Sequence, residues 1–309
     1  MSNQRTVIRS ILALMTGLLM SGVAAAKSQP LVDTAWLKQH LSDKNLVIID
    51  VFTGNQRAAF AGGHIPGALF TDFSRRWRAK IGAAPGMLPP IKEAEKLIGS
   101  YGVDAHSHVV LVPGGRKWAD FNAVTRIYWT IKTLGHDDVS ILNGGDKAWF
   151  ADASNPVAKG ESKAKPKKFV AHFRREYLAT RADVKRAISS HDAVLIDTRP
   201  PNQFEGKAKS RVVRIAGTLP GAVDLPVENL LTADGTRLAS DATIDAALAK
   251  AGVKTTGKQI SFCNTGHLAS GPWFILHEIK GNKQISLYAG SMSDWTSDPK
   301  LPVVNGPGS

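Results

Sequence analysis

The chain contains the same series of short sequence blocks twice, and this duplication constrains its fold more than any other feature. Each copy has an apolar run ending near an aspartate, a Gly-x-x-Pro-Gly-Ala turn, a second apolar run, and a last apolar stretch followed by small residues. The blocks lie at 46–50, 63–68, 108–112 and 141–145 in the first copy, and at 193–197, 217–222, 258–262 and 287–291 in the second. Four blocks in one order indicate a duplicated domain rather than chance.

Within each copy, short apolar runs alternate with stretches of helical period. These stretches include 91–101, 119–134, 240–251 and 269–279. Apolar strands separated by helices are typical of parallel sheets that helices cover on both faces. We therefore expect an α/β fold of two tandem domains, each a central parallel sheet flanked by helices. Ligands of such sheets bind where strands end and helices begin, so a site is expected at that edge.

The blocks also predict how the chain is divided. We expect a first domain at 27–157, a linker at 158–170 and a second domain at 171–309. Between the copies, 158–168 reads AKGESKAKPKK, which offers almost nothing to bury. Such a composition indicates an exposed linker, whose lysines are expected to be solvated rather than to form a docking site.

Residues 1–26 have the features of a secretory signal peptide. Arg5 and Arg9 precede an apolar run at 10–23, and Ala24-Ala25-Ala26 supplies the small residues of a cleavage site. The run is shorter than the roughly 20 residues that a membrane-spanning helix needs. We therefore expect cleavage after Ala26, an exported, periplasmic protein, and no stable membrane insertion.

The chain is basic, with a formal net charge of +13. Loss of Arg5 and Arg9 with the leader would lower this charge by two and leave it strongly positive. A basic surface can serve small anionic substrates, an anionic membrane surface or nucleic acid, or can have no specific partner. Export makes nucleic acid the least expected of these.

The second copy carries the only cysteine, Cys263, at a strand-to-helix junction. Because no internal disulfide is possible, this thiol is either an inert core residue or a reactive one. The apolar run 259–262 leads directly into the loop Cys263, Asn264, Thr265, Gly266, His267 and Leu268, and a helix is expected to follow. Gly266 can adopt backbone angles closed to other residues. The loop can then curl so that its N–H groups and the helix start favour a thiolate.

A cysteine persulfide is also an anion, so the same loop would hold it without a metal or a cofactor. We expect neither. The other histidines show no spacing that would make metal ligands with Cys263. Double displacement through such a persulfide predicts ping-pong kinetics.

These features resemble the rhodanese family of sulfurtransferases over about residues 31–304. The residues that carry the resemblance are the loop 263–269, the strand end Asp197-Thr198-Arg199, the two Gly-x-x-Pro-Gly-Ala turns and the segment Met87-Leu88-Pro89. The resemblance implies a two-domain member with an active second domain. It implies a sulfurtransferase that moves sulfane sulfur from a small anionic donor, thiosulfate or 3-mercaptopyruvate, to cyanide, a thiol or a protein cysteine.

The first copy has Pro113 where the second has Cys263, so it lacks a nucleophile and resembles the inactive partner domain of the family. The resemblance places the pocket between the domains, where the first copy would contribute side chains. The candidates are Arg75, Arg76, Trp77 and Arg78. A solvated basic loop explains the same residues equally well.

The second copy also departs from the family pattern. Gln203 stands where the family has an arginine that helps to hold the anionic donor. The basic residues that follow it, chiefly Lys207 and Arg211 with Lys209 and Arg214, either compensate or form a surface insertion. Asp224 stands where asparagine is frequent. The loop residues Asn264, Thr265 and His267 match neither the thiosulfate-type nor the mercaptopyruvate-type members.

Three further residues are given roles by the resemblance. Asp197 and Arg199 resemble a family pair that braces the active loop through a charge-assisted hydrogen bond, and are expected to support the loop rather than take part in chemistry. His267 either tunes the sulfur anion and contacts substrate, or caps the loop.

Three alternative functions remain at this stage. A phosphatase of related fold would need an arginine at Ala269, where its cysteine loop ends. A non-enzymatic sulfur carrier or protein-binding module would need no turnover at all. A structural thiol would titrate near the free value of about 8.5.

Overall fold

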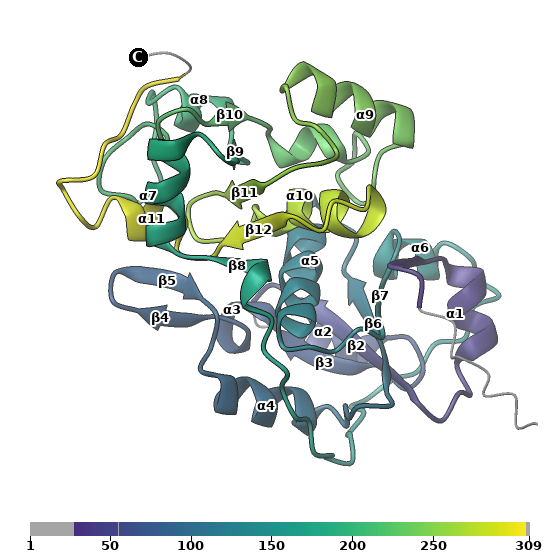
Figure 1. Ribbon diagram of the computed structural model, residues 1–309. Coiled ribbons are helices and arrows are strands. Elements are labelled where there is room, and N and C mark those ends of the chain that lie inside the picture. The colour runs from purple at the N-terminus through teal and green to yellow at the C-terminus, as the bar shows by residue number, and fades with distance from the viewer. Residues whose placement is uncertain (1–27, 55, 307–309) are drawn as a thin grey trace, which may run out of the picture.

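The computed structural model describes residues 28–54 and 56–306. It contains two five-stranded sheets, one built from each copy of the repeat (Figure 1). The expected signal peptide at 1–26 lies outside the described residues. Within them, no helix combines the length and the apolar character needed to cross a bilayer.

The first sheet is entirely parallel, with strand order β1-β7-β6-β2-β3. Its strands are β1 (Leu31–Val32), β2 (Leu46–Phe52), β3 (Leu69–Asp72), β6 (His108–Pro113) and β7 (Val139–Leu142). The central strands β6 and β7 are buried along almost their whole length. Unbroken apolar runs are what a parallel sheet covered on both faces requires.

The second sheet repeats this topology, with strand order β8-β12-β11-β9-β10. Its strands are β8 (Leu178–Ala179), β9 (Val194–Asp197), β10 (Val223–Asp224), β11 (Gln259–Phe262) and β12 (Ile285–Tyr288). Each strand therefore has a partner at the same place in the other sheet. The predicted fold, two tandem α/β domains with central parallel sheets, is confirmed.

Helices flank both sheets. In the first half they are α1 (Thr34–His40), α2 (Arg57–Gly62), α3 (Phe73–Arg76), α4 (Ile91–Ser100), α5 (Trp118–Thr133) and α6 (Gly145–Phe150). In the second they are α7 (Arg181–Ser190), α8 (Pro201–Phe204), α9 (Asp241–Lys250), α10 (Ser270–Phe274) and α11 (Ser291–Trp295). Short 3₁₀ turns lie at Arg175–Tyr177 and Val227–Leu230, and α10 continues as a π-helical turn at Ile275–Ile279. The helix expected at 269–279 is therefore present but widened in its second half.

Helix α5 lies between the two domains (Figure 1). Every residue from Asp120 to Thr133 is buried, because one side of the helix covers the first sheet and the other packs against α10. The hydroxyl groups of Thr125 and Ser270 lie 2.8 Å apart across this contact. The first domain therefore extends directly over the helix that follows the cysteine loop.

A two-stranded antiparallel hairpin also joins the domains. It consists of β4 (Ala79–Ile81) and β5 (Ala84–Met87), and β5 contacts α11 of the second domain. Figure 1 shows the hairpin reaching from the first domain towards the second. Residues that precede and end this hairpin are therefore brought to the domain interface.

Candidate active site

Cys263 follows β11 directly, at the carboxyl edge of the second sheet. Its thiol is free and only 1% of the residue is exposed. The apolar residues of β11 hold the strand in the core, so the chain can turn only after Phe262. The expected position of the cysteine at a strand-to-helix junction is thus what the structure contains, but the thiol lies beneath the first domain rather than open to solvent.

Ser291, the first residue of α11, fixes the shape of the cysteine loop. Its Oγ accepts hydrogen bonds of 3.0 Å from the backbone amides of both Cys263 and Gly266, and donates to the carbonyl of Tyr288. Gly266 has φ +70°, as its glycine identity predicts, and a Cβ there would lie 2.7 Å from the Ala289 carbonyl oxygen. The serine was not among the predicted site residues.

The remaining loop amides are unengaged. Within the described residues, the amides of Asn264, Thr265, His267 and Leu268 donate to no protein acceptor. In the same part of the chain no hydrogen bond reaches the Cys263 sulfur. The expectation that the loop amides point at Sγ is therefore not met, because two of them bind Ser291 and none of the others donates to the sulfur. The four others leave a set of donors that an anion could fill.

Two arginines of the first domain stand beside the thiol. Arg126 comes from the middle of α5 and is fully buried, and Arg78 lies between α3 and the hairpin. Both guanidinium groups interact electrostatically with Cys263. Burial, followed by the charge of Arg78, lowers the pKa of Arg126 to about 9, which leaves it charged at neutral pH. Arg78 belonged to the predicted basic segment, whereas Arg126 was missed.

His267 is a neutral group in this site. Burial, followed by the charges of Arg78 and Arg126, lowers its pKa to about 3. Its ring lies 4.8 Å from that of Phe73, and its Nε2 atom is buried without a hydrogen-bond partner. The histidine therefore adds no positive charge to the sulfur site, although it can take part in a hydrogen bond.

Asn264 connects the loop to the residue that replaces the expected family arginine. Its Nδ2 atom donates a hydrogen bond of 2.9 Å to Oε1 of Gln203. Gln203 is thus in contact with the loop, but it supplies no charge. On the other side of the loop, a Cβ on Gly86 would meet the carbonyl oxygen of Thr265 at 1.9 Å, so the hairpin backbone lies against the loop.

Asp197 and Arg199 form a fully buried ion pair of 2.6 Å at the end of β9. The carboxylate also accepts from the Thr218 hydroxyl, and the guanidinium donates to the carbonyl of Gly217. The pair makes no direct hydrogen bond to the cysteine loop within the described residues. Thr198 between them donates to the carbonyl of Phe262, next to Cys263, so any support of the loop passes through this residue.

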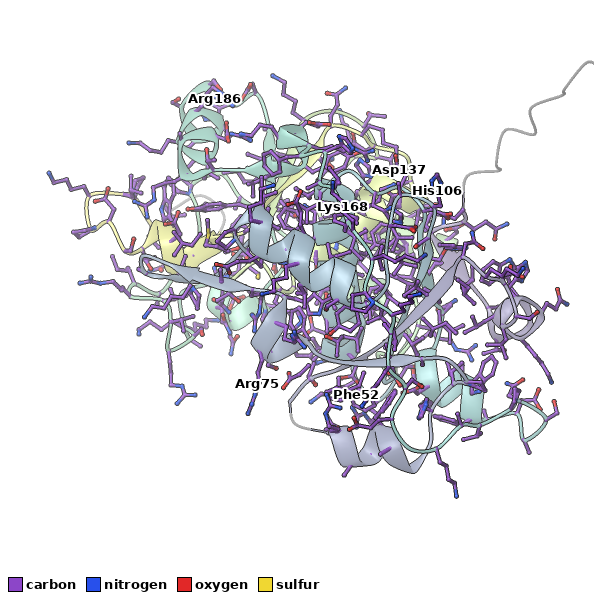
Figure 2. All side chains as sticks on the ribbon, turned by 90° about the horizontal axis from the view of Figure 1, so that it is seen from below. Phe52, Arg75, His106, Asp137, Lys168 and Arg186 are labelled. Atoms are coloured by element: carbon purple, nitrogen blue, oxygen red, sulfur yellow. The ribbon has the colours of Figure 1, made fainter. Side chains whose placement is uncertain are left out.

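The other predicted basic residues lie on the surface. Arg75 is exposed beside Asp72, at the edge of the molecule in Figure 2, and Arg76 is exposed as well. Lys207 pairs with Glu205 at 2.8 Å, and Arg211 is exposed. None of these four side chains is brought to the thiol. Trp77, from the same predicted segment, is buried and donates to the Thr71 hydroxyl.

The corresponding junction of the first domain has a different chemistry. Pro113 ends β6 and offers no nucleophile, as the alignment of the copies predicts. Nearby, burial raises the pKa of Asp146 to about 7. Burial, followed by the charge of Asp146, raises the pKa of Asp50 well above its usual range. The raised pKa values favour the protonated, neutral form of these two carboxyl groups, so this junction does not carry a reactive anion like a thiolate.

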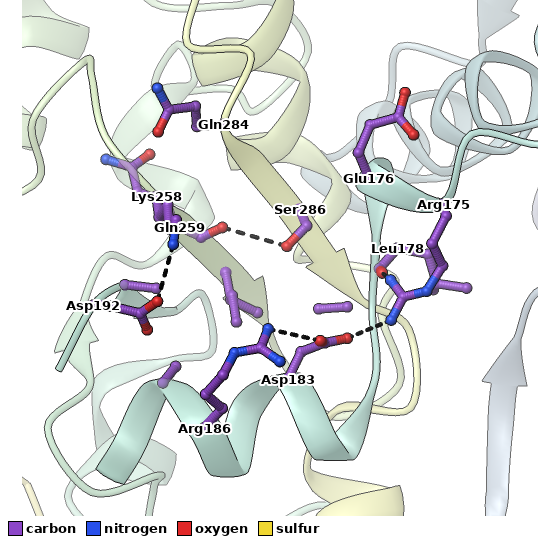
Figure 3. A pocket seen from close by; sticks show the side chains of 14 residues that line it. Arg175, Glu176, Leu178, Asp183, Arg186, Asp192, Lys258, Gln259, Gln284 and Ser286 are labelled. Atoms are coloured by element: carbon purple, nitrogen blue, oxygen red, sulfur yellow. Dashed lines mark hydrogen bonds and ion pairs between the residues drawn. The ribbon is translucent and has the colours of Figure 1, made fainter. Parts of the chain in front are cut away.

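A pocket in the second domain lies at the wrong edge of the sheet for this chemistry (Figure 3). It is lined by Lys258 and Gln259, where β11 begins, whereas Cys263 follows the end of the strand. Most of its charges are paired with one another, as in Arg186 with Asp183 and Lys258 with Asp192. Nothing in it connects to the cysteine loop. Across the described residues, no three His, Cys, Asp or Glu side chains are grouped so as to hold a metal ion.

Comparison with known proteins agrees with two similar domains around one cysteine loop. The model of the "Rhodanese-like domain" matches residues 33–152 and again 180–298. A "Putative thiosulfate sulfurtransferase" of Saccharopolyspora erythraea is 28% identical over 286 residues, which cover 91% of this chain and 98% of that protein. One from Mycolicibacterium smegmatis is 29% identical over 287 residues, covering 91% and 99%.

Solved structures share the fold. SseA from Escherichia coli, described with the "Rhodanese" fold of 3-mercaptopyruvate sulfotransferases, superposes with a TM-score of 0.73 at 24% identity and covers 85% of this chain and 99% of its own. The anaerobic ergothioneine biosynthesis enzyme from Chlorobium limicola gives a TM-score of 0.77 at 22% identity, covering 90% and 70%.

Two parallel-sheet domains of one topology, with a cysteine loop at the carboxyl edge of the second, define a tandem protein of the rhodanese type. The chain belongs to the rhodanese-like domain family, which it contains in two copies. It is a sulfurtransferase enzyme.

Proposed function

We propose that Cys263 carries sulfur as a persulfide from a small anionic donor, thiosulfate or 3-mercaptopyruvate, to a nucleophilic acceptor. The names of the relatives support a donor of this kind. The acceptor would be cyanide, a small thiol or a protein cysteine. Neither the transfer of sulfur to Cys263 nor its delivery to the acceptor needs a cofactor.

One observation carries this proposal: the chain's only cysteine lies in a loop with four unengaged amides and beside two guanidinium groups. The sulfur atom itself receives none of these amides in the thiol form. An outer sulfur, bonded to Sγ, would extend beyond the position of the thiol and so could accept from loop amides that Sγ does not reach. We therefore assign the amides of Asn264, Thr265, His267 and Leu268 to the outer sulfur of a persulfide rather than to the thiolate.

The chemistry is a double displacement. With thiosulfate, the Cys263 thiolate attacks the outer sulfur, a new S–S bond forms, the S–S bond of the donor breaks, and sulfite leaves with the electron pair. With cyanide as acceptor, carbon attacks the outer sulfur, thiocyanate is released, and the thiolate returns. No external oxidant or reductant is consumed in either step.

The thiol is 1% exposed, so the donor must enter by displacing the residues that cover the loop. The hairpin of the first domain is part of this cover, because Gly86 lies against Thr265 of the loop. Water exclusion by this cover would protect the persulfide from side reactions while it waits for an acceptor. Burial, followed by the charges of Arg78 and Arg126, lowers the pKa of His267 to about 3, so this residue is neutral at neutral pH before a donor binds.

Steady-state kinetics with a panel of donors and acceptors tests the proposal. Parallel lines in double-reciprocal plots are expected for the productive donor, and Cys263→Ser should be inactive. Intersecting lines, or turnover by Cys263→Ser, would rule out a persulfide carried by this cysteine.

We also propose that the enzyme acts after export, on the basis of the apolar leader and its Ala24-Ala25-Ala26 site. Expression of the full chain in a bacterium with a cell envelope of two membranes, followed by fractionation and amino-terminal sequencing, tests this. A mature chain beginning at Lys27 in the periplasm is expected. An intact amino terminus in the cytoplasm would contradict it.

A further inference from the structure

Arg126, which is fully buried, and Arg78, which is half-buried, lack the carboxylate partners that other buried cations of the described chain have. Buried Arg199 pairs with Asp197 at 2.6 Å, and buried Lys132 pairs with Asp137 at 2.7 Å. Within the described residues, neither Arg78 nor Arg126 forms an ion pair with a carboxylate. The Nε atoms of both arginines are buried and have no hydrogen-bond partner.

Arg126 is held in place by neutral groups alone. It donates to the Thr130 hydroxyl and to the carbonyl of Gly86, both at 2.9 Å, and its guanidinium lies 4.3 Å from the centre of the Trp129 ring. Arg78 lies 4.8 Å over the Phe73 ring and makes no hydrogen bond within the described residues. The two cations also repel one another, which helps to lower the pKa of Arg126.

Leaving the buried charge of Arg126 unpaired is costly, and the half-buried cation of Arg78 nearby adds to this cost. Proteins normally offset this cost with a carboxylate, which is absent from this place in the described chain. A bound anionic donor would offset this cost during turnover.

Both arginines are connected to the cysteine loop through one intervening residue. Arg126 holds Gly86, whose backbone touches Thr265 of the loop. Arg78 stacks on Phe73, whose ring lies 4.8 Å from His267. Each of them is therefore one residue away from the loop, and each interacts electrostatically with Cys263.

We propose that Arg78 and Arg126, both from the first domain, form the donor-binding site, and that they select a donor with two negative charges, such as thiosulfate. The inference rests on the proposed sulfur transfer and adds the identity of the groups that recognise the donor. Two cations balance a dianion, whereas 3-mercaptopyruvate carries one full charge at neutral pH, on its carboxylate. In the second domain, Gln203 offers no charge and is occupied by Asn264. The domain without a nucleophile would thus supply the electrostatic part of the site.

The first test compares variants of two basic residues that lie two positions apart in the sequence. Arg78→Gln and Lys80→Gln each remove one positive charge, but Lys80 is exposed on β4 and lies outside the site. Arg78→Gln should raise the KM for thiosulfate about tenfold or more, as expected for loss of a charged hydrogen bond. Its effect on kcat should be smaller, and Lys80→Gln should leave both constants unchanged. Equal effects of the two variants would overturn the proposal.

Arg126 has structural contacts, so Arg126→Lys is the variant of choice, since it keeps the charge and removes the planar fork. It should raise the thiosulfate KM while its thermal unfolding stays close to that of the parent. A parent-like KM in a folded Arg126→Lys protein would count against a binding role for this residue.

Binding without turnover provides an independent test. Cys263→Ser protein should bind thiosulfate in a calorimeter more tightly than 3-mercaptopyruvate, and addition of Arg78→Gln should weaken thiosulfate binding about tenfold or more. No thiosulfate binding, tighter binding of 3-mercaptopyruvate, or no effect of Arg78→Gln would overturn the inference. If instead the parent enzyme gains no sulfur on Cys263 from any donor, the proposed function fails, whatever the binding results.

Discussion

Gly86 of the first domain and Thr265 of the cysteine loop are in such close contact that a Cβ on the glycine would lie 1.9 Å from the threonine carbonyl oxygen. The two residues belong to different domains and are far apart in the sequence. The inactive copy therefore closes over the site of the active one by backbone contact, and Arg126 holds the glycine carbonyl in that position.

Substitution of Gly86 should therefore separate the domains locally. Gly86→Ala must displace the hairpin or the loop, because the nearest atoms are backbone, and should cost about 1–3 kcal/mol of stability. Alkylation of Cys263 should become faster as the cover is lost, while sulfur transfer becomes slower. Gly62→Ala, where nothing lies within 4 Å, is the matched control. Unchanged alkylation in Gly86→Ala would show that the hairpin does not cover the thiol.

Removal of the Ser291 hydroxyl should loosen the loop. Ser291→Ala leaves the buried amides of Cys263 and Gly266 without their acceptor, which should lower the free energy of unfolding by about 1–3 kcal/mol. Transfer activity should fall with it. Ser293→Ala removes a buried hydroxyl that bonds only to the carbonyl of Gly290, and should leave activity near the parent value. Urea unfolding and donor kinetics on both variants check this, and equal activity losses would contradict it.

Local patterns in the sequence were sufficient to predict the duplicated fold and the place of Cys263. Strand β11 was predicted as 259–262, because an apolar run followed by a glycine-containing loop depends on neighbouring residues only. The positive φ of Gly266 could be predicted for the same reason.

The rest of the site depends on tertiary packing. The periodicity around Arg126 predicts a helix but does not predict that this residue is buried. Its burial arises because both domains cover α5. Arg78, unlike Arg75 and Arg76, is turned inwards only because the chain passes from α3 into the hairpin there. For Ser291 a pattern did exist. It occupies the place of Gly145 in the other copy, and both have positive φ, at 50° and 56°. A serine kept in a conformation that favours glycine indicates a side chain with a specific task.

The neutral state of His267 predicts a stability effect in acid. The pKa of His267 is about 3 in the folded protein and 6.5 in its ordinary state, so only the unfolded chain takes up this proton between those values. The contribution of neutral His267 to the free energy of unfolding is therefore fully present above pH 6.5. It is lost as the pH falls towards 3, by about 2 kcal/mol at pH 5. His267→Gln should lose less stability than the parent between pH 7 and pH 5.

Urea unfolding at the two pH values measures this difference. The exposed His106→Gln serves as control and should follow the parent. If His267→Gln and the parent lose the same free energy on acidification, the histidine is not held neutral by the site.

The buried acids of the first domain predict the opposite dependence on pH. Burial raises the pKa of Asp146 from 3.8 to about 7, so the folded protein keeps a proton that the unfolded chain has released. The stability contribution of this group is present below pH 3.8 and is lost as the pH rises through about 7. Asp146→Asn should therefore be more stable than the parent at pH 8, and the gain should shrink towards pH 5. Thermal unfolding against pH checks this, with exposed Asp43→Asn as control, and a constant difference would contradict it.

Intact-protein and peptide mass spectrometry after exposure to thiosulfate tests the central claim most directly. One added sulfur atom should appear on the peptide that contains Cys263, should disappear on treatment with cyanide as thiocyanate forms, and should be absent from Cys263→Ser. A parent protein that stays unmodified under conditions of turnover, or an added sulfur that remains in Cys263→Ser, would contradict the assignment of this residue as the sulfur carrier.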